Sequence, residues 1–360
     1  MSGRMLFFTV VMMSGCVVED AADPNDENLG EVEQGLIGGC PEWECGGNSP
    51  LLNGHPVLWI YESSEAVTPD GWRLMSFVSK QGISVRLDVE DGKLKGYDFL
   101  TGAVAISMDK ANLVDSRMTI KNENTGELFY VLVAAAQRSY TWAKPVGWAM
   151  PPLIETYKFK WVEVKNCPAG TVCDWKNLCS DAPLDEGIPP ENTILFEGDI
   201  INAQYKTISY RVDKGRANIG CAGSAHAKLM LTGHTYPMAA YGLYTTYLER
   251  QTALKMFTGD FTGSGKPYTQ PKTPLRWIDN NGWMHMADQG DNPYGVTIES
   301  RWTPYGASCL SKARLPEIEA AIADDGYPVP ANCEPSSPYQ FDSKHLVSAT
   351  PNPWYVLTSL

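Results

Sequence analysis

The sequence lacks the features that mark several large classes of protein. No run of Lys or Arg stands out and the formal net charge is -13, which argues against electrostatic binding of nucleic-acid phosphates by Lys and Arg. No apolar stretch reaches the ~18 residues of a membrane-spanning helix. Long helical patterns are few, whereas 32 Gly and 25 Pro among 360 residues favour a fold rich in strands and turns. With 43% apolar and 20% charged residues, the chain has the composition of a folded protein.

The patterns along the chain predict an α+β fold that is mainly β. Apolar or alternating runs separated by turn sequences indicate an antiparallel sheet or sandwich-like arrangement in the N-terminal region. The clear alternation of 154–164 predicts a strand with one face in solvent. A strand-rich C-terminal region carries two or three short helices, each closed by a Gly. The predicted strands lie at 56–62, 72–80, 83–89, 128–136, 154–164, 192–198, 207–212 and 295–302, and the helices at 223–233, 245–257 and 315–326.

The N-terminus has the pattern of an export signal. Residues 1–15 combine Arg4, a short apolar run and small residues just before Cys16. This arrangement is typical of a lipoprotein signal peptide, after which Cys16 becomes the first mature residue and carries acyl chains. Two or more chains hold a protein on a bilayer durably, at about 0.8 kcal/mol per buried CH₂. An ordinary secretory signal cleaved near Cys16 is the alternative. Val17 rather than Asp after Cys16 favours the outer membrane.

Composition divides the chain into six parts. Residues 17–34 hold seven acids and no Lys or Arg, so seven of the 13 excess negative charges belong to a solvated spacer. We expect a signal peptide at 1–15, the lipidated Cys16 with an acidic linker at 16–49, a β-rich region at 50–165, a Cys-rich connector at 166–190, a second domain at 191–315, and a short helix with a Pro-rich tail at 316–360.

The nine Cys residues fit an oxidising compartment. Without the lipidated Cys16 eight remain, an even number, as in a disulfide-linked secreted protein. Cys40 and Cys45 lie close enough for a local bridge. Three Cys cluster in the connector, so at least one of them pairs elsewhere, with Cys221, Cys309 or Cys333 as candidates. The full set of disulfide candidates is Cys40, Cys45, Cys167, Cys173, Cys179, Cys221, Cys309 and Cys333.

Five short segments of the second domain resemble a known family in their content and order. They are CAGSAHAK at 221–228, GHTYP at 233–237, KMFTGDFTG at 255–263, TPLRWID at 273–279 and IESRWTPYGASC at 298–309. In this order they resemble the ADYC domain of uncharacterised secreted or lipid-anchored proteins from myxobacteria and their relatives. The Leu-Asn-Gly at 52–54 resembles the opening that such proteins carry before the domain. The resemblance implies an ADYC-like domain at 191–315, and it implies architecture rather than a reaction.

The segment that gives this family its name is degenerate here. Asp260 and the aromatic Phe261 stand where the family has Ala-Asp-Tyr-Cys, and Thr262 replaces its Cys. Leu229 and Ala253 also stand where the family pattern has Cys. The resemblance therefore implies that the missing Cys are structural bridges in relatives. No catalytic or metal-binding Cys can act at these positions in this chain.

Several patterns that suggest chemistry are incomplete. Gly259–Pro267 resembles a phosphate loop but has the wrong spacing and a Pro where a metal-binding Ser or Thr belongs, so a Gly-rich turn is the better interpretation. Ser107–Lys110 matches the S-x-x-K of serine acylases without the partner motifs. The connector has Cys spacings of five residues and no His, which does not suit zinc. We therefore expect no metal and no cofactor.

Scattered His and acidic residues leave a catalytic interpretation open. Cys221 with His226 or His234 would supply a nucleophile and a base, although a secreted Cys is more often bridged. His285 has Asp279 nearby. A hydrolase with paired carboxylates would need them about 5 to 10 Å apart in a cleft.

Aromatic residues are abundant, with 11 Trp and 17 Tyr. Trp142 and Trp148 lie with several Pro residues in a predicted loop. Exposed rings in loops can stack on glycans or anchor protein contacts, whereas packing in the core is the commoner role of such rings.

Together these features favour an exported, lipid-anchored protein of the cell outer membrane or cell surface. Its ectodomain would bind or scaffold, and a non-enzymatic role is favoured over catalysis. We expect its partners to be the lipid bilayer, through N-terminal acyl chains, and envelope proteins or glycans, with no nucleic acid. The alternative is a secreted hydrolase acting on cell-wall or polysaccharide substrate, with Asp260 or another carboxylate facing a His. A purely structural envelope component is a third hypothesis.

Overall fold

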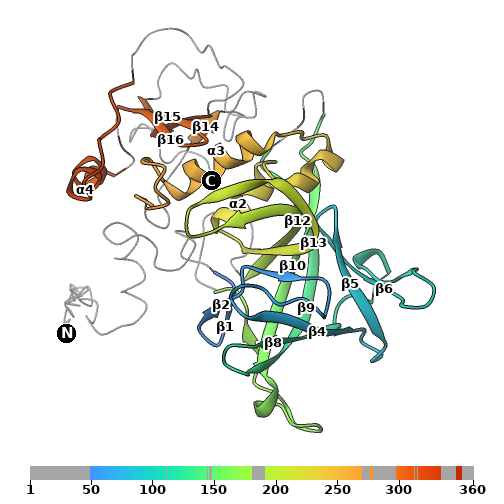
Figure 1. Cartoon of the computed structure of the whole chain (residues 1–360). Coiled ribbons are helices and arrows are strands. Elements are labelled where there is room, and N and C mark those ends of the chain that lie inside the picture. Colours follow the sequence, from blue (N-terminus) through green and yellow to red (C-terminus); the bar gives the residue numbers. More distant parts are fainter. Residues whose placement is uncertain are drawn as a thin grey trace, which may run out of the picture.

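The computed structural model describes residues 49–110, 112–143, 145, 148–180, 191–269, 276–278, 297–311, 313, 315–333 and 346–350. The predicted signal peptide, the lipidation site Cys16, the acidic linker and the Cys40–Cys45 bridge lie outside the described residues, as does His285. The described part is an α+β fold that is mainly β, with antiparallel sheets, short helices and disulfides, as the sequence predicts (Figure 1).

Most strands form one antiparallel sheet of 11 strands. Ten of them have the order β3-β13-β12-β10-β9-β8-β4-β5-β6-β7, and β11 pairs with β10. A small hairpin, β1 and β2, precedes them. The bounds are Leu51–Leu52 (β1), His55–Pro56 (β2), Trp59–Tyr61 (β3), Trp72–Val78 (β4), Ser84–Glu90 (β5), Lys93–Tyr97 (β6), Val104–Ile106 (β7), Arg117–Asn122 (β8), Leu128–Tyr140 (β9), Leu153–Glu163 (β10), Lys176–Asn177 (β11), Asn192–Asn202 (β12) and Thr207–Cys221 (β13).

This large sheet curls, so that β5 contacts β12 and β13 although other strands separate them in the pairing order. Alternation places one side of each strand inside the curl. In β5, for example, Val85, Leu87 and Val89 are buried while Ser84 and Glu90 are exposed. The enclosed core contains a cavity of about 20 Å³ lined by apolar side chains. That volume is about the space of one water molecule, so the cavity is a packing void rather than a ligand site.

The large sheet continues across the Cys-rich connector at 166–190. Strands β12 and β13, which follow the connector, pair with β10 and β3, which precede it. The connector therefore does not separate two sheets. Strand pairing and shared apolar burial join the predicted regions 50–165 and 191–315 in one fold.

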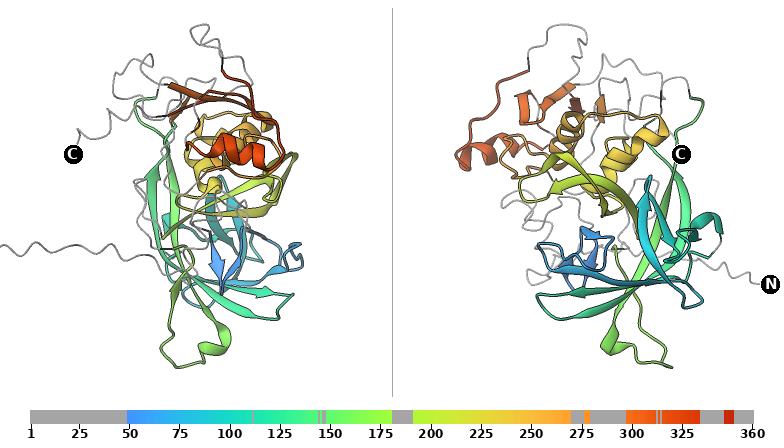
Figure 2. Two further views of the ribbon diagram at one scale, coloured as in Figure 1. Left: turned by 90° about the vertical axis from the view of Figure 1, so that its left-hand side faces the viewer. Right: turned by 45° about the vertical axis from the view of Figure 1, so that its right-hand side comes forward.

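A layer of helices lies between the large sheet and a smaller one (Figure 2). Helix α2 packs on β12 and β13, and α3 packs on β13 and also on β15, β16 and β17. The smaller sheet has the order β14-β17-β15-β16. Helix α4 contributes two buried Ile residues to the core that α2 and α3 form between the two sheets. The bounds are Ala225–Leu231 (α2), Tyr247–Thr258 (α3), Ile318–Asp324 (α4), Arg276–Ile278 (β14), Thr297–Thr303 (β15), Gly306–Leu310 (β16) and Leu346–Thr350 (β17); the 3-10 helices span Met108–Lys110 (η1), Val164–Asn166 (η2) and Tyr236–Tyr241 (η3).

Local sequence signals fix the ends of α3. The hydroxyl of Thr246 accepts the N–H of Glu249, whose carboxylate accepts the N–H of Thr246, a reciprocal capping box. Gly259 ends the helix with φ 61°, a left-handed conformation that Gly adopts without steric cost. The predicted helix at 245–257 is confirmed within two residues at its start and one at its end.

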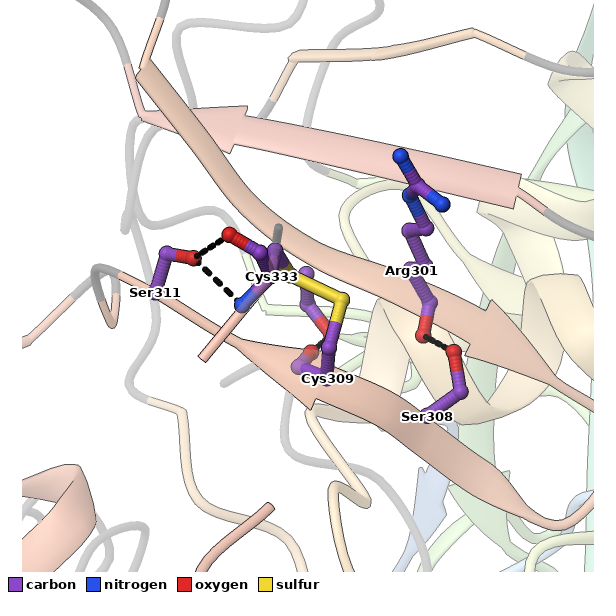
Figure 3. Close-up of a disulfide and its surroundings, with 6 residues drawn as sticks. Arg301, Ser308, Cys309, Ser311 and Cys333 are labelled. Carbon is purple, nitrogen blue, oxygen red and sulfur yellow. Dashed lines mark hydrogen bonds between the residues drawn. A yellow bond between two sulfur atoms is a disulfide. The ribbon is translucent and has the colours of Figure 1, made fainter. Parts of the chain in front are cut away.

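Three disulfides join described residues: Cys167–Cys173, Cys179–Cys221 and Cys309–Cys333. One connector Cys thus pairs outside the connector, with Cys221, one of the three predicted candidates. The Cys309–Cys333 bridge returns the chain after α4 to β16, where the hydroxyl of Ser311 accepts the N–H of Cys333 at 2.7 Å and donates to its carbonyl (Figure 3). The disulfides indicate an extracellular or otherwise oxidising environment.

Loss of the long-range disulfide is expected to cost more stability than loss of the local one. The bridged residues are 42 apart for Cys179–Cys221 and 6 apart for Cys167–Cys173. Loop-closure entropy then gives losses of about 4 and about 2 kcal/mol for the two double Cys→Ala variants. Urea unfolding measures both. Equal losses would show that constraint of the unfolded chain is not the main contribution of these bridges.

Candidate functional site

Helix α3 is buried on nearly every side because it lies between the two sheets. Every residue from Arg250 to Thr258 is buried. The amide of Gln251 is satisfied by backbone groups of the β12–β13 turn and the start of β13. The helix also carries two cations, Arg250 and Lys255. Both need an anionic partner, because an unpaired charge is costly away from water.

Three oxygen acceptors surround the ammonium of Lys255. The carboxylate of Asp260 forms an ion pair with it, and the carbonyl oxygens of Tyr205 and Gly263 accept at 2.9 and 3.3 Å. These acceptors match the three donors of an ammonium. The side chains of Lys255 and Asp260 are 2% and 0% exposed. Burial raises the pKa of Asp260, and the adjacent Lys255 opposes that rise. Asp260 is thus a buried counter-ion.

The Gly-rich turn at 259–267 is built around this ion pair. The N–H of Gly265 donates to the Asp260 carboxylate at 2.9 Å. The N–H groups of Gly263 and Lys266 have acceptors within the turn as well. A phosphate loop presents free N–H groups to its ligand. Because these N–H groups are already bonded, the segment is a structural turn, as the sequence indicates.

The other family-motif positions have packing roles. The ring of Phe261 lies 4.6 Å from that of Trp302, centre to centre, and joins the turn to the smaller sheet. Leu229 of α2 and Ala253 of α3 are fully buried in the core that both helices share. The hydroxyl of Thr262 lies 2.7 Å from that of Ser264. Apolar packing and local hydrogen bonds therefore account for the side chains at 229, 253 and 262.

The second cation of α3 pairs with β12. The Nε of Arg250 lies 2.8 Å from Oδ1 of Asp199, and the N–H of Tyr236 donates to Oδ2 at 2.7 Å. Burial raises the pKa of Asp199, and Arg250 opposes that rise. Burial also lowers the pKa of His234 to about 4, so this imidazole is neutral at pH 7; its Nδ1 lies 3.0 Å from the hydroxyl of Thr232.

The residues that left a catalytic interpretation open are not arranged for it where the structure describes them. Cys221 is bridged to Cys179 and is not a free thiol. His226 packs edge-on against Phe196, with ring centres 6.2 Å apart. Asp260 faces Lys255 rather than a His.

The S-x-x-K segment is likewise structural, because the ammonium of Lys110 donates to the carbonyl of Val104. Among the described residues, no three His, Cys, Asp or Glu side chains are grouped so that they could hold a metal ion. No helix in the same part of the chain is long and apolar enough to cross a membrane.

A buried carboxylate fastens the β5–β6 turn to β12. Glu197 accepts the N–H groups of Asp91 and Gly92, both at 3.1 Å. The hydroxyl of Tyr241 donates to the Asp91 carbonyl at 2.8 Å. Gly92 has φ 69°, a left-handed conformation that favours Gly, and a Cβ there would also displace the methyl group of Met230. Sequence reasoning missed Glu197, because its role depends on a turn 105 residues away.

Burial also raises the pKa of two carboxyl groups around this turn. The pKa of Glu197 rises to about 7 and that of Glu62 to about 8, from an ordinary value of 4.5. In both cases backbone N–H donors oppose the rise; the donor to Glu62 is the N–H of Val89, at 2.8 Å.

A group of exposed aromatic side chains gathers around the β9–β10 hairpin tip and the start of α3. Trp148, 49% exposed, covers Gly242, where a Cβ would lie 3.5 Å from the indole. Tyr244 follows two residues later and is 73% exposed. The rings of Tyr247 and Tyr210 then meet edge-on, with centres 6.4 Å apart. We call the exposed side chains of Tyr140, Trp148, Met150, Leu153, Tyr210, Tyr244 and Tyr247 the aromatic face.

The other Trp of the predicted loop is half-buried against the core. Trp142 packs against the apolar core that contains the α2 side chains. Its backbone N–H donates to the carbonyl of Leu231 at 2.7 Å. Of the two Trp residues, Trp142 therefore packs against the core, whereas Trp148 is exposed.

The fold and the buried pairs describe a disulfide-linked, mainly β protein with a central buried helix. A model of the ADYC domain family matches residues 110–316, more than half of the chain, and the protein belongs to this family. The match begins in η1 and includes β8–β10, so the family unit starts before the 191 that the sequence suggests. Comparison with curated proteins and with solved structures finds no match to this chain.

Breaking the Lys255–Asp260 pair on one side is expected to destabilise the protein strongly. Lys255→Met and Asp260→Asn each leave one charge buried without its partner, which costs about 3–5 kcal/mol. The double variant removes both charges and keeps an acceptor for Gly265, so it should lose less than the two single losses combined. Urea unfolding of all three variants measures this coupling. Strictly additive losses would contradict it.

Stability is expected to fall as the pH rises from 6.5 to 8. The folded state keeps protons on Glu62 and Glu197 to higher pH than the unfolded chain does, so ionisation in this window favours unfolding. We expect a loss on the order of 1–2 kcal/mol. His234 acts in the opposite direction, because its lowered pKa makes stability rise with pH. That rise takes place mainly below 6.5, the pKa of His in the unfolded chain, and so outside this window. Glu62→Gln should flatten the slope, whereas Glu65→Gln, at an exposed position, should leave it unchanged.

Proposed function

We propose that this protein is a lipid-anchored cell-envelope protein whose ectodomain binds other envelope components without catalysing a reaction. The aromatic face carries the proposal. Tyr and Trp side chains combine an apolar ring with a hydrogen-bonding group, and they dominate the energetic centres of binding surfaces. Five such rings on neighbouring segments offer a ready contact surface.

Placement of the rings supports binding rather than incidental exposure. Trp148 lies on a hairpin tip that is braced by the η3–α3 loop, and Tyr210 and Tyr247 brace each other across two elements. Rings held in this way lose little conformational freedom when a partner arrives. Envelope glycans, with C–H faces and hydroxyl rims, and envelope proteins both suit a surface of this chemistry.

Location and anchoring rest on other observations. The disulfides agree with export to an oxidising compartment. The sequence around Cys16 supports lipidation, and the acidic segment at 17–34 supports a solvated spacer between the anchor and the folded part. The outer membrane is the expected site.

Co-sedimentation of the full chain with envelope fractions tests the binding role. Trp148→Ala and Tyr244→Ala should each reduce retention about tenfold, the effect of losing one aromatic anchor worth about 1–2 kcal/mol. Tyr305→Ala is the matched control, because Tyr305 is 82% exposed on the β15–β16 turn and lies outside the aromatic face.

Treatment of the envelopes separates the two partner classes. Protease digestion removes a protein partner, and glycan-degrading enzymes remove a glycan partner. Equal retention of the wild type and both aromatic variants would reject the aromatic face as the binding site. Mass spectrometry of the N-terminal peptide tests the anchor, which Cys16→Ser should abolish.

A further inference from the structure

A second group of exposed apolar side chains lies on turns of the β4–β8 part of the large sheet and shares no residue with the aromatic face. The β6–β7 turn carries Phe99 and Leu100, which are 67% and 96% exposed. Ile83 in the β4–β5 turn and Val114 before β8 are also exposed. We call these four side chains the apolar tip.

Strand register places these turns at the same end of the sheet. In an antiparallel meander every second turn returns to the same edge, so the β4–β5 and β6–β7 turns share one end. Arg117 pairs with Val78 at that end, just after Val114. The β4–β5 turn is also tied to this segment by the Lys80–Asp115 ion pair, at 2.6 Å. In Figure 1, β5 and β6 extend to the right, away from the smaller sheet.

The β6–β7 turn is held in shape without help from its apolar side chains. The carboxylate of Asp98 accepts the N–H groups of Leu100 and Thr101 at 3.0 and 2.7 Å, and the hydroxyl of Thr101 at 2.9 Å. The N–H of Gly102 donates to the Asp98 carbonyl at 3.0 Å. Phe99 and Leu100 are therefore presented on an ordered turn, and burying them requires no further ordering of the backbone.

We propose that the apolar tip inserts into the surface of a lipid bilayer. Side chains that project from separate turns suit a deformable apolar medium, which accepts them without a complementary pocket. Neighbouring charges of both signs are paired, as in Lys80–Asp115 and Arg86–Asp88, so the contact does not depend on anionic lipid.

The bilayer is also the apolar phase nearest to the tip. This step rests on the proposed lipid anchor at Cys16. The segment from Cys16 to Ser49 spans at most about 120 Å when fully extended, which keeps the folded part within reach of the membrane. Tethering makes the second contact effectively intramolecular, so even a weak insertion is populated. The tip then orients the folded part on the membrane.

Nitroxide labels on the full, lipidated chain in phosphatidylcholine vesicles test this orientation. One label replaces Leu100 (Leu100→Cys), and a control label replaces the exposed Thr125 (Thr125→Cys) in the β8–β9 turn, at the opposite end of β8. Insertion predicts that the label at 100 collides more with oxygen and less with a water-soluble nickel chelate than the label at 125. The difference between the two labels should persist at high salt. It should disappear in a control without vesicles.

The possible outcomes separate the two proposals. If the chain does not float with the vesicles, the anchor fails. If it floats while both labels meet the nickel chelate equally, insertion of the tip is rejected and the anchor stands. A label at 100 shielded from both relaxants, or broadened by a second spin, indicates a protein partner or a second copy, and it also overturns insertion. Phe99→Ser in the Leu100→Cys chain should return the label to water, because it removes the larger apolar neighbour.

Discussion

Burial of helix α3 is the constraint on which the arrangement of the C-terminal half depends. The helix lies between two sheets, yet it carries Arg250 and Lys255. Each cation is paired with a buried carboxylate, and each carboxylate also accepts a backbone N–H from outside the helix: Asp199 from Tyr236, and Asp260 from Gly265. The ion pairs therefore do more than neutralise charge. They fix η3 and the Gly-rich turn to the helix, and they make Asp260 a part of the structural framework.

Local signals predicted the elements well, because they act within a few residues. The T-x-x-E of the capping box and the following Gly set the limits of α3 before any packing is known. Burial was harder to predict. The alternation in 154–164 predicted one solvent face for β10, but the neighbours Thr156 and Tyr157, which point to opposite faces, are both fully buried. The helix layer and the curl of the sheet cover both faces, and neither is visible in a local pattern.

Long-range partners could not be predicted for the same reason. Asp199 and Arg250 pair across 51 positions of sequence, and nothing near either residue indicates the other. The connector showed that one of its Cys must pair elsewhere, but choosing Cys221 required the fold. Trp142 and Trp148 are six residues apart in one loop with similar surroundings. Only the packing of the first against the core around α2 makes it half-buried, whereas the second stays exposed.

The way polar groups are used bears on what the protein can do. Three buried carboxylates, Asp199, Asp260 and Glu197, are committed to cations or backbone N–H groups that hold the fold together. A catalytic carboxylate needs a hydrogen-bonding site left for its substrate. Exposed aromatic rings differ from these carboxylates, because covering their apolar surface with a partner lowers the free energy. The fold thus uses its buried charges for stability and leaves its exposed aromatic side chains available for contact, in line with the binding role that we propose.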